Sequence, residues 1–401
     1  MKKDLISFAL AVLALASCSK NELGKAGDTV KKIQTDFYSM TVEGDAGFKH
    51  FLEQGGASST EELADFLGDY LSAGPWGKLK CTLTPGEFAC SALCVQSPDG
   101  APMMGRNFDW ENCKSMIVSC FPKNAYSSVS TVNLDFLGFG EDYKPEGMIN
   151  CYKATAGVYV PMDGINQMGL VVADLMAGDK EITAQSEPGK KNLTTTTAIR
   201  LLLNYAADVD EAVKLLSEYN VHSDIGSAHH LMIADAKGRS VAVEWVDNQM
   251  IVTPSEVLNN HYLCDPKKGV GSGEESLAHE RCLLELNAEC GGVMDSEQLA
   301  DAMFKVLSLP NESYYGGTQW TIVYNLRDCS ATYYLRRDRD RAHSFSAAGS
   351  GAGRLFAAGG PSRVHFFGLA GLVPNRLVKH PLTEGPRSHI LHQTRQFCRV
   401  W

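Results

Sequence analysis

The sequence has no excess of basic residues. Its 401 residues include 37 Lys and Arg against 47 Asp and Glu, so the formal net charge is −10 at pH 7. A protein that binds a phosphate backbone needs a broad basic surface, so this charge argues against nucleic acid as a partner. Apolar residues make up 44% of the chain and charged residues 21%, which predicts a globular protein with a large core.

The sequence also lacks the spacings of a metal site and of a disulfide framework. His229, His230, His261 and Cys264 show neither paired CxxC nor HxxxH spacing, so we expect no metal and no cofactor. The 12 cysteines form no repeated ladder, and a chain of this length folds without disulfide staples.

No apolar run after residue 16 reaches the roughly 20 residues that span a bilayer. At the start of the chain, Lys2 and Lys3 precede an apolar stretch over residues 5–16, and small residues lead to Cys18. This order resembles a bacterial lipoprotein signal. We therefore expect residues 1–18 to be a signal peptide with its lipobox, and the protein to be exported to the cell envelope. A lipid on Cys18 is then the only expected membrane contact.

Residues 19–89 form a polar leader that contains one amphipathic helix. Ser59 and Glu62 have the spacing of a capping box at the start of this helix. The apolar side chains that follow share one helical face: Leu63, Phe66, Leu67, Tyr70 and Leu71. Such a face is covered in a folded protein, so the leader is expected to dock on the rest of the chain.

Short strands and turns dominate residues 90–345, the expected catalytic domain. Strands are predicted at 90–96, 102–105, 157–160, 165–173, 231–234, 241–245, 250–253, 321–325 and 331–335, with turns at 97–100, 163–164, 235–238 and 247–248. Helices are predicted around 199–203, from Asp208 with Glu211 three residues on, and over about 296–307. With few βαβ units, this pattern predicts an α+β fold, a four-layer αββα sandwich of two antiparallel sheets with helices outside.

The composition changes after about Ser346. Gly, Ala, Ser, Arg and His accumulate over residues 346–401, and Glu384 is the only carboxylate side chain beyond Ser346. This pattern is typical either of a disordered extension or of an out-of-frame end, and we expect the segment to contribute little to folding.

A hairpin brings one cysteine close to a cluster of polar residues. Ser97-Pro98-Asp99-Gly100 has the chemistry of a turn between two short strands. Cys90 and the group from Arg106 to Asp109 therefore become neighbours. Arg106 can stabilise a thiolate, and Asp109 can orient an amine if Cys90 becomes the first residue of the chain.

In that case the nucleophile and its base belong to one residue, because a free α-amino group has a pKa of about 7.7–8.0. Cys94 is the rival nucleophile, but it lies too close to the turn to pair with Arg106 in the same way.

The spacing of these residues resembles the choloylglycine hydrolase and penicillin V acylase family, the linear amide C-N hydrolases of the Ntn-hydrolase superfamily. In that family the mature chain starts with Cys, crosses a hairpin and reaches Gly-Arg-Asn-x-Asp, as at Cys90 and residues 105–109 here. Residues 163–170, 229–245 and 317–326 resemble further strands of the family. The resemblance covers residues 90 to about 335.

The resemblance implies more site residues. "VLNNHYL" (257–263) resembles the segment that bears the family's oxyanion asparagine, which assigns that role to Asn260, with Asn259 adjacent. The family's late arginine corresponds to Arg281. Met176 stands where bile salt hydrolases have Asn and penicillin V acylases have Tyr, so this position assigns neither substrate. The interval from Asn260 to Arg281 has no room for the long hairpin that Gram-positive members use in tetramers, and the oligomeric state stays open.

The function implied is that of a cysteine-dependent hydrolase of linear, non-peptide N-acyl amides, matured by autocleavage before Cys90. Its small-molecule substrates would be conjugated bile salts, penicillin V, or N-acyl amino acids and ethanolamides. The apolar helical face of the leader suggests that the leader stays bound after cleavage. The alternative is a catalytically inactive surface lipoprotein that uses the fold as a binding module.

Overall fold

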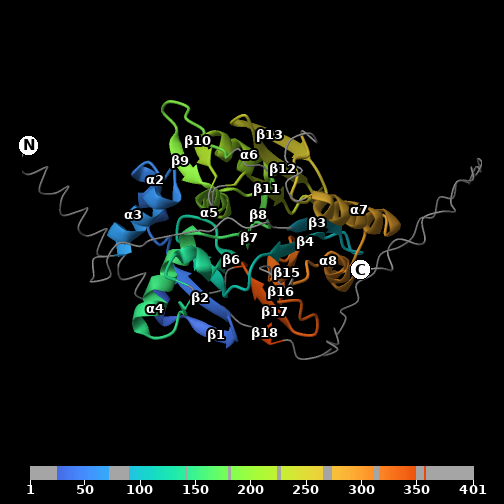
Figure 1. Cartoon of the computed structure of the whole chain (residues 1–401), viewed down its shortest axis with the longest axis horizontal. Coiled ribbons are helices and arrows are strands. Elements are labelled where there is room, and N and C mark those ends of the chain that lie inside the picture. The colour runs from blue at the N-terminus through green and yellow to red at the C-terminus, as the bar shows by residue number, and fades with distance from the viewer. Residues whose placement is uncertain are drawn as a thin grey trace, which may run out of the picture. The chain divides into compact units, whose positions relative to one another are not determined.

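Two stacked β-sheets form the centre of the molecule, and helices cover the outer face of each (Figure 1). The computed structural model describes residues 25–71, 90–140, 142–178, 182–223, 227–264, 273–310, 316–348 and 356–357. Within these ranges, no helix combines the length and apolar character that a membrane crossing needs.

The larger sheet has nine strands in the described chain. In spatial order they are β1 (Lys31–Gln34), β2 (Phe37–Glu43), β5 (Ser115–Phe121), β6 (Ser128–Asn133), β7 (Asp163–Asn166), β8 (Val171–Met176), β11 (His229–Ala234), β12 (Ser240–Val246) and β13 (Gln249–Pro254). Neighbouring strands are antiparallel except β2 and β5, which run parallel. The expectation of purely antiparallel sheets is wrong at this pair, because a long crossover that includes the leader helices joins the two strands.

The smaller sheet has seven described strands, all antiparallel to their neighbours. In spatial order they are β14 (Val257–Leu258), β3 (Ser91–Gln96), β4 (Pro102–Asp109), β15 (Thr318–Asn325), β16 (Ser330–Leu335), β17 (Ala342–Ser346) and β18 (Phe356–Ala357). A separate parallel pair joins β9 (Lys191–Thr194) to β10 (Tyr219–His222).

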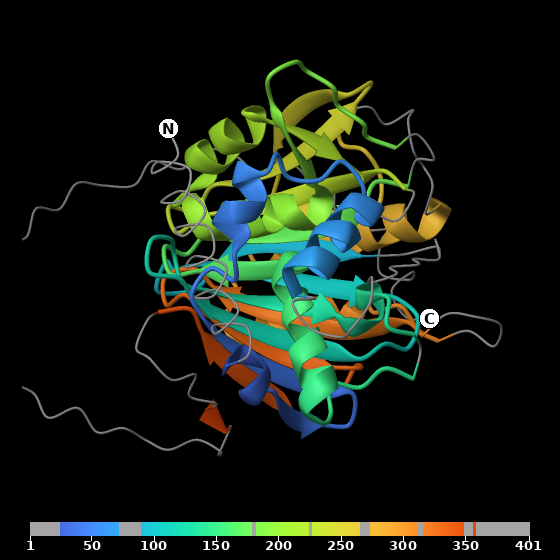
Figure 2. The same cartoon turned by 90° about the vertical axis from the view of Figure 1, so that its left-hand side faces the viewer.

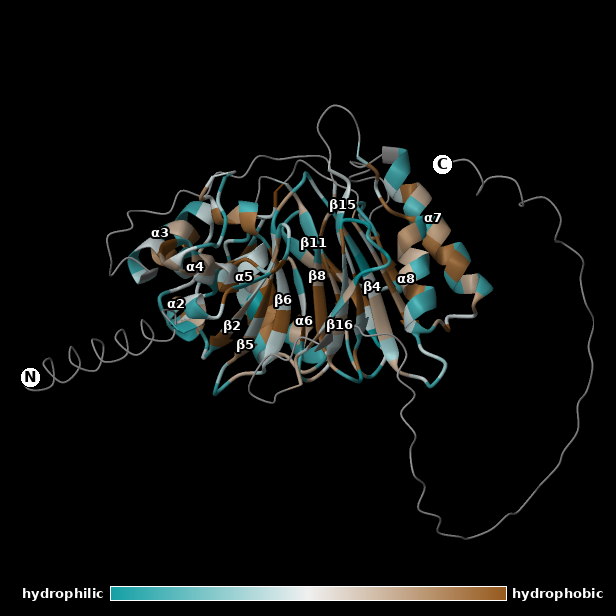
Figure 3. Ribbon diagram, turned by 90° about the horizontal axis from the view of Figure 1, so that it is seen from below, coloured by the Kyte–Doolittle hydropathy of each residue, from teal (hydrophilic) through white to brown (hydrophobic). Residues whose placement is uncertain are grey.

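Helices form the two outer layers. Against the larger sheet and its edge lie α2 (Phe48–Glu53), α3 (Thr60–Leu71), η1 (Leu134–Leu137), α4 (Met148–Lys153), η2 (Ala154–Tyr159), α5 (Thr195–Tyr205) and α6 (Val209–Ser217). Against the smaller sheet lie α7 (Gly273–Glu289) and α8 (Ser296–Lys305). Figure 3 shows α5 and α8 on opposite sides of the strands. The predicted four-layer αββα sandwich is confirmed.

Each interface between layers has its own apolar core. Alternate residues of a strand point to opposite faces, so β8 sends Val172 toward the helices and Ala173 toward the other sheet. The core between the sheets includes Cys90, Phe108 and Trp320. The site described below therefore belongs to the inner layer.

The leader is part of the sandwich. β2 pairs with β5 along all seven residues, and Leu63 and Leu67 of α3 are buried in the core beneath the helices. Figure 2 shows these leader elements in blue against the larger sheet. The expected docking is thus observed for residues 25–71, whereas Cys18 and the rest of the expected signal lie outside the described residues.

Ser59 begins α3 as predicted, with one difference in the cap. Its hydroxyl accepts the N–H of Glu62 at 3.2 Å. The Glu62 carboxylate reaches back to the N–H of Ser58 at 2.7 Å instead of that of Ser59. The helix start is confirmed, and the reciprocal bond is shifted by one residue.

The predicted strand at 157–160 and turn at 163–164 are wrong. Residues 154–159 form the 3₁₀ helix η2, and Asp163-Gly164 lies inside strand β7. A Cβ on Gly164 would lie 2.7 Å from the Val129 carbonyl oxygen and 2.8 Å from Leu203 of α5. This glycine serves the close approach of a helix and not a turn, which instead falls at residues 166–169.

The predicted strand at 165–173 is wrong as a single element, because the turn at residues 166–169 divides it into β7 and β8. The remaining predicted strands and helices are observed. The three-stranded meander is β11–β12–β13, and the helices are α5, α6 and α8. Asp208 caps α6 by accepting the N–H of Glu211 at 3.0 Å. Beyond Ser346, Ala347 is buried and β18 pairs with β17. The remainder of the expected tail lies outside the described residues.

Candidate active site

Cys90 lies directly before β3, with its side chain buried between the sheets. Ser91 pairs with Asn107 across the hairpin, so the end of β4 folds back onto Cys90. The backbone N–H of Asp109 donates to the Cys90 sulfur. The predicted closeness of the two hairpin ends is therefore observed.

Arg106 extends from β4 into the same inner layer, where it is fully buried. Its Nε lies 3.0 Å from an Asp163 carboxylate oxygen, and one terminal nitrogen donates to the Asp174 carbonyl oxygen at 2.8 Å. The guanidinium also lies over the Phe108 ring, 4.9 Å from its centroid. Although burial alone lowers the pKa of Arg106, the Asp163 carboxylate and Cys90 raise it above its ordinary value.

Asp163, which the sequence predicts in a turn and not in the site, holds this arginine. Its carboxylate accepts the Thr131 hydroxyl at 2.5 Å, the Tyr324 hydroxyl at 2.9 Å and the Trp320 indole N–H at 3.1 Å. Several donors from distant strands thus fix the anion, and through it the direction of Arg106. The only sequence signal was an acidic residue within an otherwise apolar alternating stretch.

The environment of Cys90 favours the protonated thiol. Burial raises the pKa of Cys90 to about 12, and the Arg106 guanidinium offsets only part of this shift. A base or an opened site is therefore required before the thiol becomes a nucleophile.

Asp109 turns its carboxylate toward the α8 side of the sheet. Thr318 and Ser308 donate their hydroxyl protons to it at 2.5 and 2.9 Å. Burial raises the pKa of Asp109 to about 7, although both hydroxyls lower it. Near neutral pH this carboxyl therefore exchanges its proton easily, while its own N–H contacts the sulfur.

The two asparagines after β14 contact different parts of this cluster. Asn259 Nδ2 donates to the Ser91 hydroxyl at 2.8 Å and to the Cys90 carbonyl oxygen at 3.4 Å. Asn260 Nδ2 donates to the Met176 carbonyl oxygen at 2.7 Å. Both lie at the Cys90 end of the sheets, and Asn259, the neighbour of the predicted oxyanion residue, contacts the Cys90 carbonyl.

The segment that carries these asparagines is anchored from two sides. The N–H of Asn260 donates to the Ser276 hydroxyl of α7 at 2.9 Å. On the other side, the Glu244 carboxylate accepts the N–H groups of Leu263 and Cys264 at 2.8 and 2.9 Å. The asparagine amides are therefore presented by backbone that is fixed to α7 on one side and to β12 of the larger sheet on the other.

Arg281 is not brought to this cluster. It lies on the exposed face of α7, and its Nε donates to the Leu277 carbonyl oxygen of the same helix at 3.3 Å. The predicted role of Arg281 has no counterpart in this geometry, because the family resemblance assigned a position on the helix and not a side-chain direction.

Two buried histidines near the site each pair with one carboxylate. His229 contacts Asp174 at 2.9 Å, and His230 contacts Glu244 at 3.2 Å. Across the described ranges no group of three His, Cys, Asp or Glu side chains is arranged to hold a metal.

The cluster contains the parts that acyl transfer needs. It has a thiol, a fixed guanidinium beside it, a carboxyl that titrates near neutrality and amide N–H donors. A nucleophile with hydrogen-bond donors aimed at a developing oxyanion suits attack on a carbonyl carbon.

Comparison with known proteins agrees with this chemistry. Residues 90–261 match the family model of linear amide C-N hydrolases, choloylglycine hydrolase family. No curated protein sequence matches the chain.

Solved structures resemble the chain at low sequence identity. A variant of the conjugated bile acid hydrolase from Clostridium perfringens is 15% identical with a TM-score of 0.50, over 67% of this chain and 97% of that chain. The penicillin V acylase from Agrobacterium tumefaciens is 15% identical with a TM-score of 0.39, over 64% of this chain and 90% of that chain. The predicted resemblance is confirmed: residues 90–261, which begin at Cys90, match the model of the choloylglycine hydrolase family of linear amide C-N hydrolases.

Proposed function

We propose that the protein hydrolyses linear N-acyl amides, with Cys90 as the nucleophile. The observation that carries this proposal is the position of the Cys90 sulfur, which receives the N–H of Asp109 and lies in the field of the buried Arg106. A thiol is a structural residue unless its surroundings favour the thiolate, and Arg106 is the group that favours it here.

Maturation precedes catalysis. While Cys90 follows Ala89, its nitrogen is an amide and cannot act as a base. The Cys90 thiol attacks the Ala89 carbonyl carbon, the C–N bond breaks, and the acyl group moves to sulfur as a thioester. Water then hydrolyses the thioester, which frees the thiol and leaves Cys90 with an α-amine. The pKa of a free α-amine is about 7.7–8.0. Ala89 lies outside the described residues.

The mature residue then carries both nucleophile and base. Its amine takes the thiol proton, the sulfur attacks the amide carbonyl carbon, and an amide N–H such as that of Asn259 or Asn260 stabilises the oxyanion. The ammonium group returns the proton to the leaving amine. Water hydrolyses the resulting acyl thioester.

The substrate class rests on the relatives and on the apolar surroundings of Cys90. The similar structures are named for conjugated bile acids and penicillin V, and both are linear amides of an apolar acyl group. Phe108 and Trp110 are buried in the core that contains Cys90, and apolar and aromatic side chains line most acyl pockets. The panel of substrates to be assayed therefore contains conjugated bile salts, penicillin V, N-acyl amino acids and N-acyl ethanolamides.

We further propose that the leader remains bound after cleavage, in an exported protein with its lipid on Cys18. The supporting contacts are the seven-residue β2–β5 pairing and the burial of Leu63 and Leu67. Removing these contacts would expose the core beneath the helices.

The test combines maturation with turnover. Intact-mass analysis and N-terminal sequencing are expected to find chains that begin at Cys90, together with the leader. Cys90→Ala is expected to remain uncut and to lose at least about 10³-fold activity, whereas the matched control Cys94→Ala is cut and active. Full activity of an uncut chain would rule out the amine as base. A cut chain without turnover on the whole panel would favour the binding-module alternative.

A further inference from the structure

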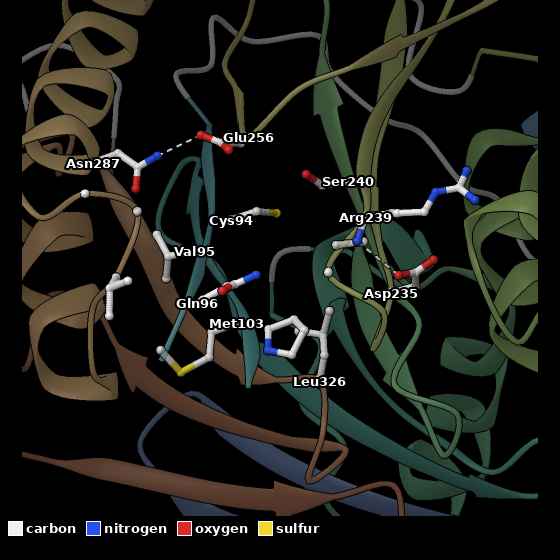
Figure 4. A pocket seen from close by; sticks show the side chains of 16 residues that line it. Cys94, Val95, Gln96, Met103, Asp235, Arg239, Ser240, Glu256, Asn287 and Leu326 are labelled. Atoms are coloured by element: carbon white, nitrogen blue, oxygen red, sulfur yellow. Dashed lines mark hydrogen bonds between the residues drawn. The ribbon is translucent and has the colours of Figure 1, made fainter. Parts of the chain in front are cut away.

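A pocket of about 230 Å³ lies at the turn end of the β3–β4 hairpin (Figure 4). Cys94 and Gln96 of β3 line it, together with residues of β12 and of the end of α7, and Cys90 does not. At about 3.4 Å per residue, Cys94 lies roughly 14 Å along the strand from Cys90. The pocket is therefore separate from the proposed catalytic site.

Asn287 of α7 is the most informative residue of this pocket. The residue is 6% exposed, and its Nδ2 donates to a Glu256 carboxylate oxygen at 2.8 Å. A carboxylate only accepts hydrogen bonds, so the amide nitrogen must face Glu256, as Figure 4 shows. This orientation turns Oδ1 away, and Oδ1 has no hydrogen-bond partner among the described residues. A buried acceptor without a donor is destabilising, so Oδ1 marks a place for a donor.

The backbone N–H groups of β3, the Ser240 hydroxyl and the Arg239 guanidinium around the pocket are already engaged. The N–H of Cys94 bonds to the Glu256 carbonyl, the N–H of Gln96 to the Gly292 carbonyl, the Ser240 hydroxyl to the Ser255 carbonyl, and the Arg239 guanidinium to Asp210. The acceptors that can meet a ligand include the buried Asn287 Oδ1 and the Glu256 carboxylate, with the exposed side-chain amide of Gln96 also in the lining. The pocket therefore calls for a ligand that donates hydrogen bonds and carries positive charge.

The Cys94 thiol adds no charge of its own. Burial raises the pKa of Cys94 to about 12, and the sulfur lies against the Ser240 side chain. The thiol is therefore an uncharged part of the pocket lining, and its rate of alkylation can show whether a ligand occupies the pocket.

We propose that this pocket is a second ligand site, which binds a small primary amine in its protonated form. The ammonium group donates to Asn287 Oδ1 and lies beside the Glu256 carboxylate, while a short apolar body contacts Val95, Met103 and Leu326. Drug-sized ligands occupy pockets of about 300–1,000 Å³, so this smaller volume suits an amine of a few heavy atoms. The proposal does not depend on the catalytic role of Cys90.

The test uses n-propylammonium at pH 7, with propionate as a probe of similar size and opposite charge. Binding to the purified chain is measured by ligand-observed NMR titration. We expect saturable binding of propylammonium and none of propionate. Asn287→Leu, which keeps the side-chain size, is expected to weaken the amine about tenfold. The exposed control Gln54→Leu leaves the affinity unchanged.

Two further measurements keep the result decisive. Glu256→Gln alters an exposed side chain, so it tests the charge without threatening the fold, and about threefold weaker binding is expected. Propylammonium is also expected to slow alkylation of Cys94 while leaving the exposed Cys290 unaffected, as measured by peptide mass mapping. Equal affinity in the wild type, Asn287→Leu and Glu256→Gln, or equal binding of propionate, would overturn the proposal and leave a solvent-filled pocket.

Discussion

Two layers of the molecule each bury an arginine, and they hold it in opposite ways. Arg106, between the sheets, lies 3.0 Å from the Asp163 carboxylate, and one of its terminal nitrogens has no hydrogen-bond partner among the described residues. Arg200 of α5, beneath the helices, donates from all three of its nitrogens to neutral oxygens. These are the Val158 carbonyl at 2.8 Å, the Ser128 hydroxyl at 2.9 Å and the Ser130 hydroxyl at 2.8 Å.

The difference separates a reactive cation from a structural one. All three side-chain nitrogens of Arg200 donate hydrogen bonds that join α5 to β6 and η2. Fixed neutral dipoles therefore stabilise its charge. Arg106 keeps part of its donor capacity near a thiol whose charge changes during the proposed reaction. Burial alone therefore does not identify a functional arginine, whereas an incomplete set of partners beside a nucleophile does.

The largest effect is expected from exchanging Arg106 for lysine. An ammonium group cannot hold Asp163 and the Asp174 carbonyl while it also faces the thiol, so Arg106→Lys is expected to lower kcat/KM about 10³-fold. Arg200→Lys, the matched change in the other layer, is expected to leave kcat/KM of the folded protein within about twofold. An equal loss of kcat/KM in both variants would contradict the distinction between the two arginines.

Asp109, whose carboxylate faces the α8 side of the smaller sheet, makes the stability sensitive to pH. Its folded-state pKa of about 7 lies above the ordinary 3.8, so its contribution to stability is complete below pH 4 and is lost as the pH rises through 7. Asp109→Asn is therefore expected to flatten the pH dependence of the unfolding free energy over this window, by up to about 4 kcal/mol. Urea melts at several pH values measure it, with Ser130→Ala as a control that keeps the wild-type slope.

Removing the structural arginine is expected to cost stability and not chemistry. Arg200→Leu leaves three buried oxygens without their donor, which lowers the free energy of unfolding by about 3 kcal/mol. The exposed Lys49→Leu is the control and is expected to change it by less than about 0.5 kcal/mol. Denaturant melts give the result, and a large drop in kcat of the folded Arg200→Leu protein would contradict the assignment.

The smallest effects come from single hydroxyls in the two layers. Ser130→Ala removes one acceptor of Arg200, and Tyr324→Phe removes one donor of Asp163; each is expected to lower the unfolding free energy by about 1 kcal/mol. Only Tyr324→Phe is expected to lower kcat as well, by a few-fold, because Asp163 orients Arg106. Identical kinetics for the two variants would show that Asp163 does not position the arginine.

Local chemistry was enough to place the centre of the site. A turn at residues 97–100 and antiparallel pairing bring Cys90 to Arg106 and Asp109 within twenty residues of chain, so their meeting needs no distant contact. The helix starts at Ser59 and Asp208 were equally local, because a cap is a bond between residues three apart. The two-sheet architecture followed from the alternation of strands and helices.

Contacts between distant parts of the chain determine the other features of the site. Asp163-Gly164 has the composition of a turn, yet Leu203 and Val129 require a strand glycine there, and residues 131, 320 and 324 turn the aspartate into the anchor of Arg106. The contact of Asn259 with the Cys90 carbonyl, and the outward direction of Arg281, depend on how β14 and α7 pack. Neighbouring positions carry similar residue types, so only packing determines which side chain reaches Cys90.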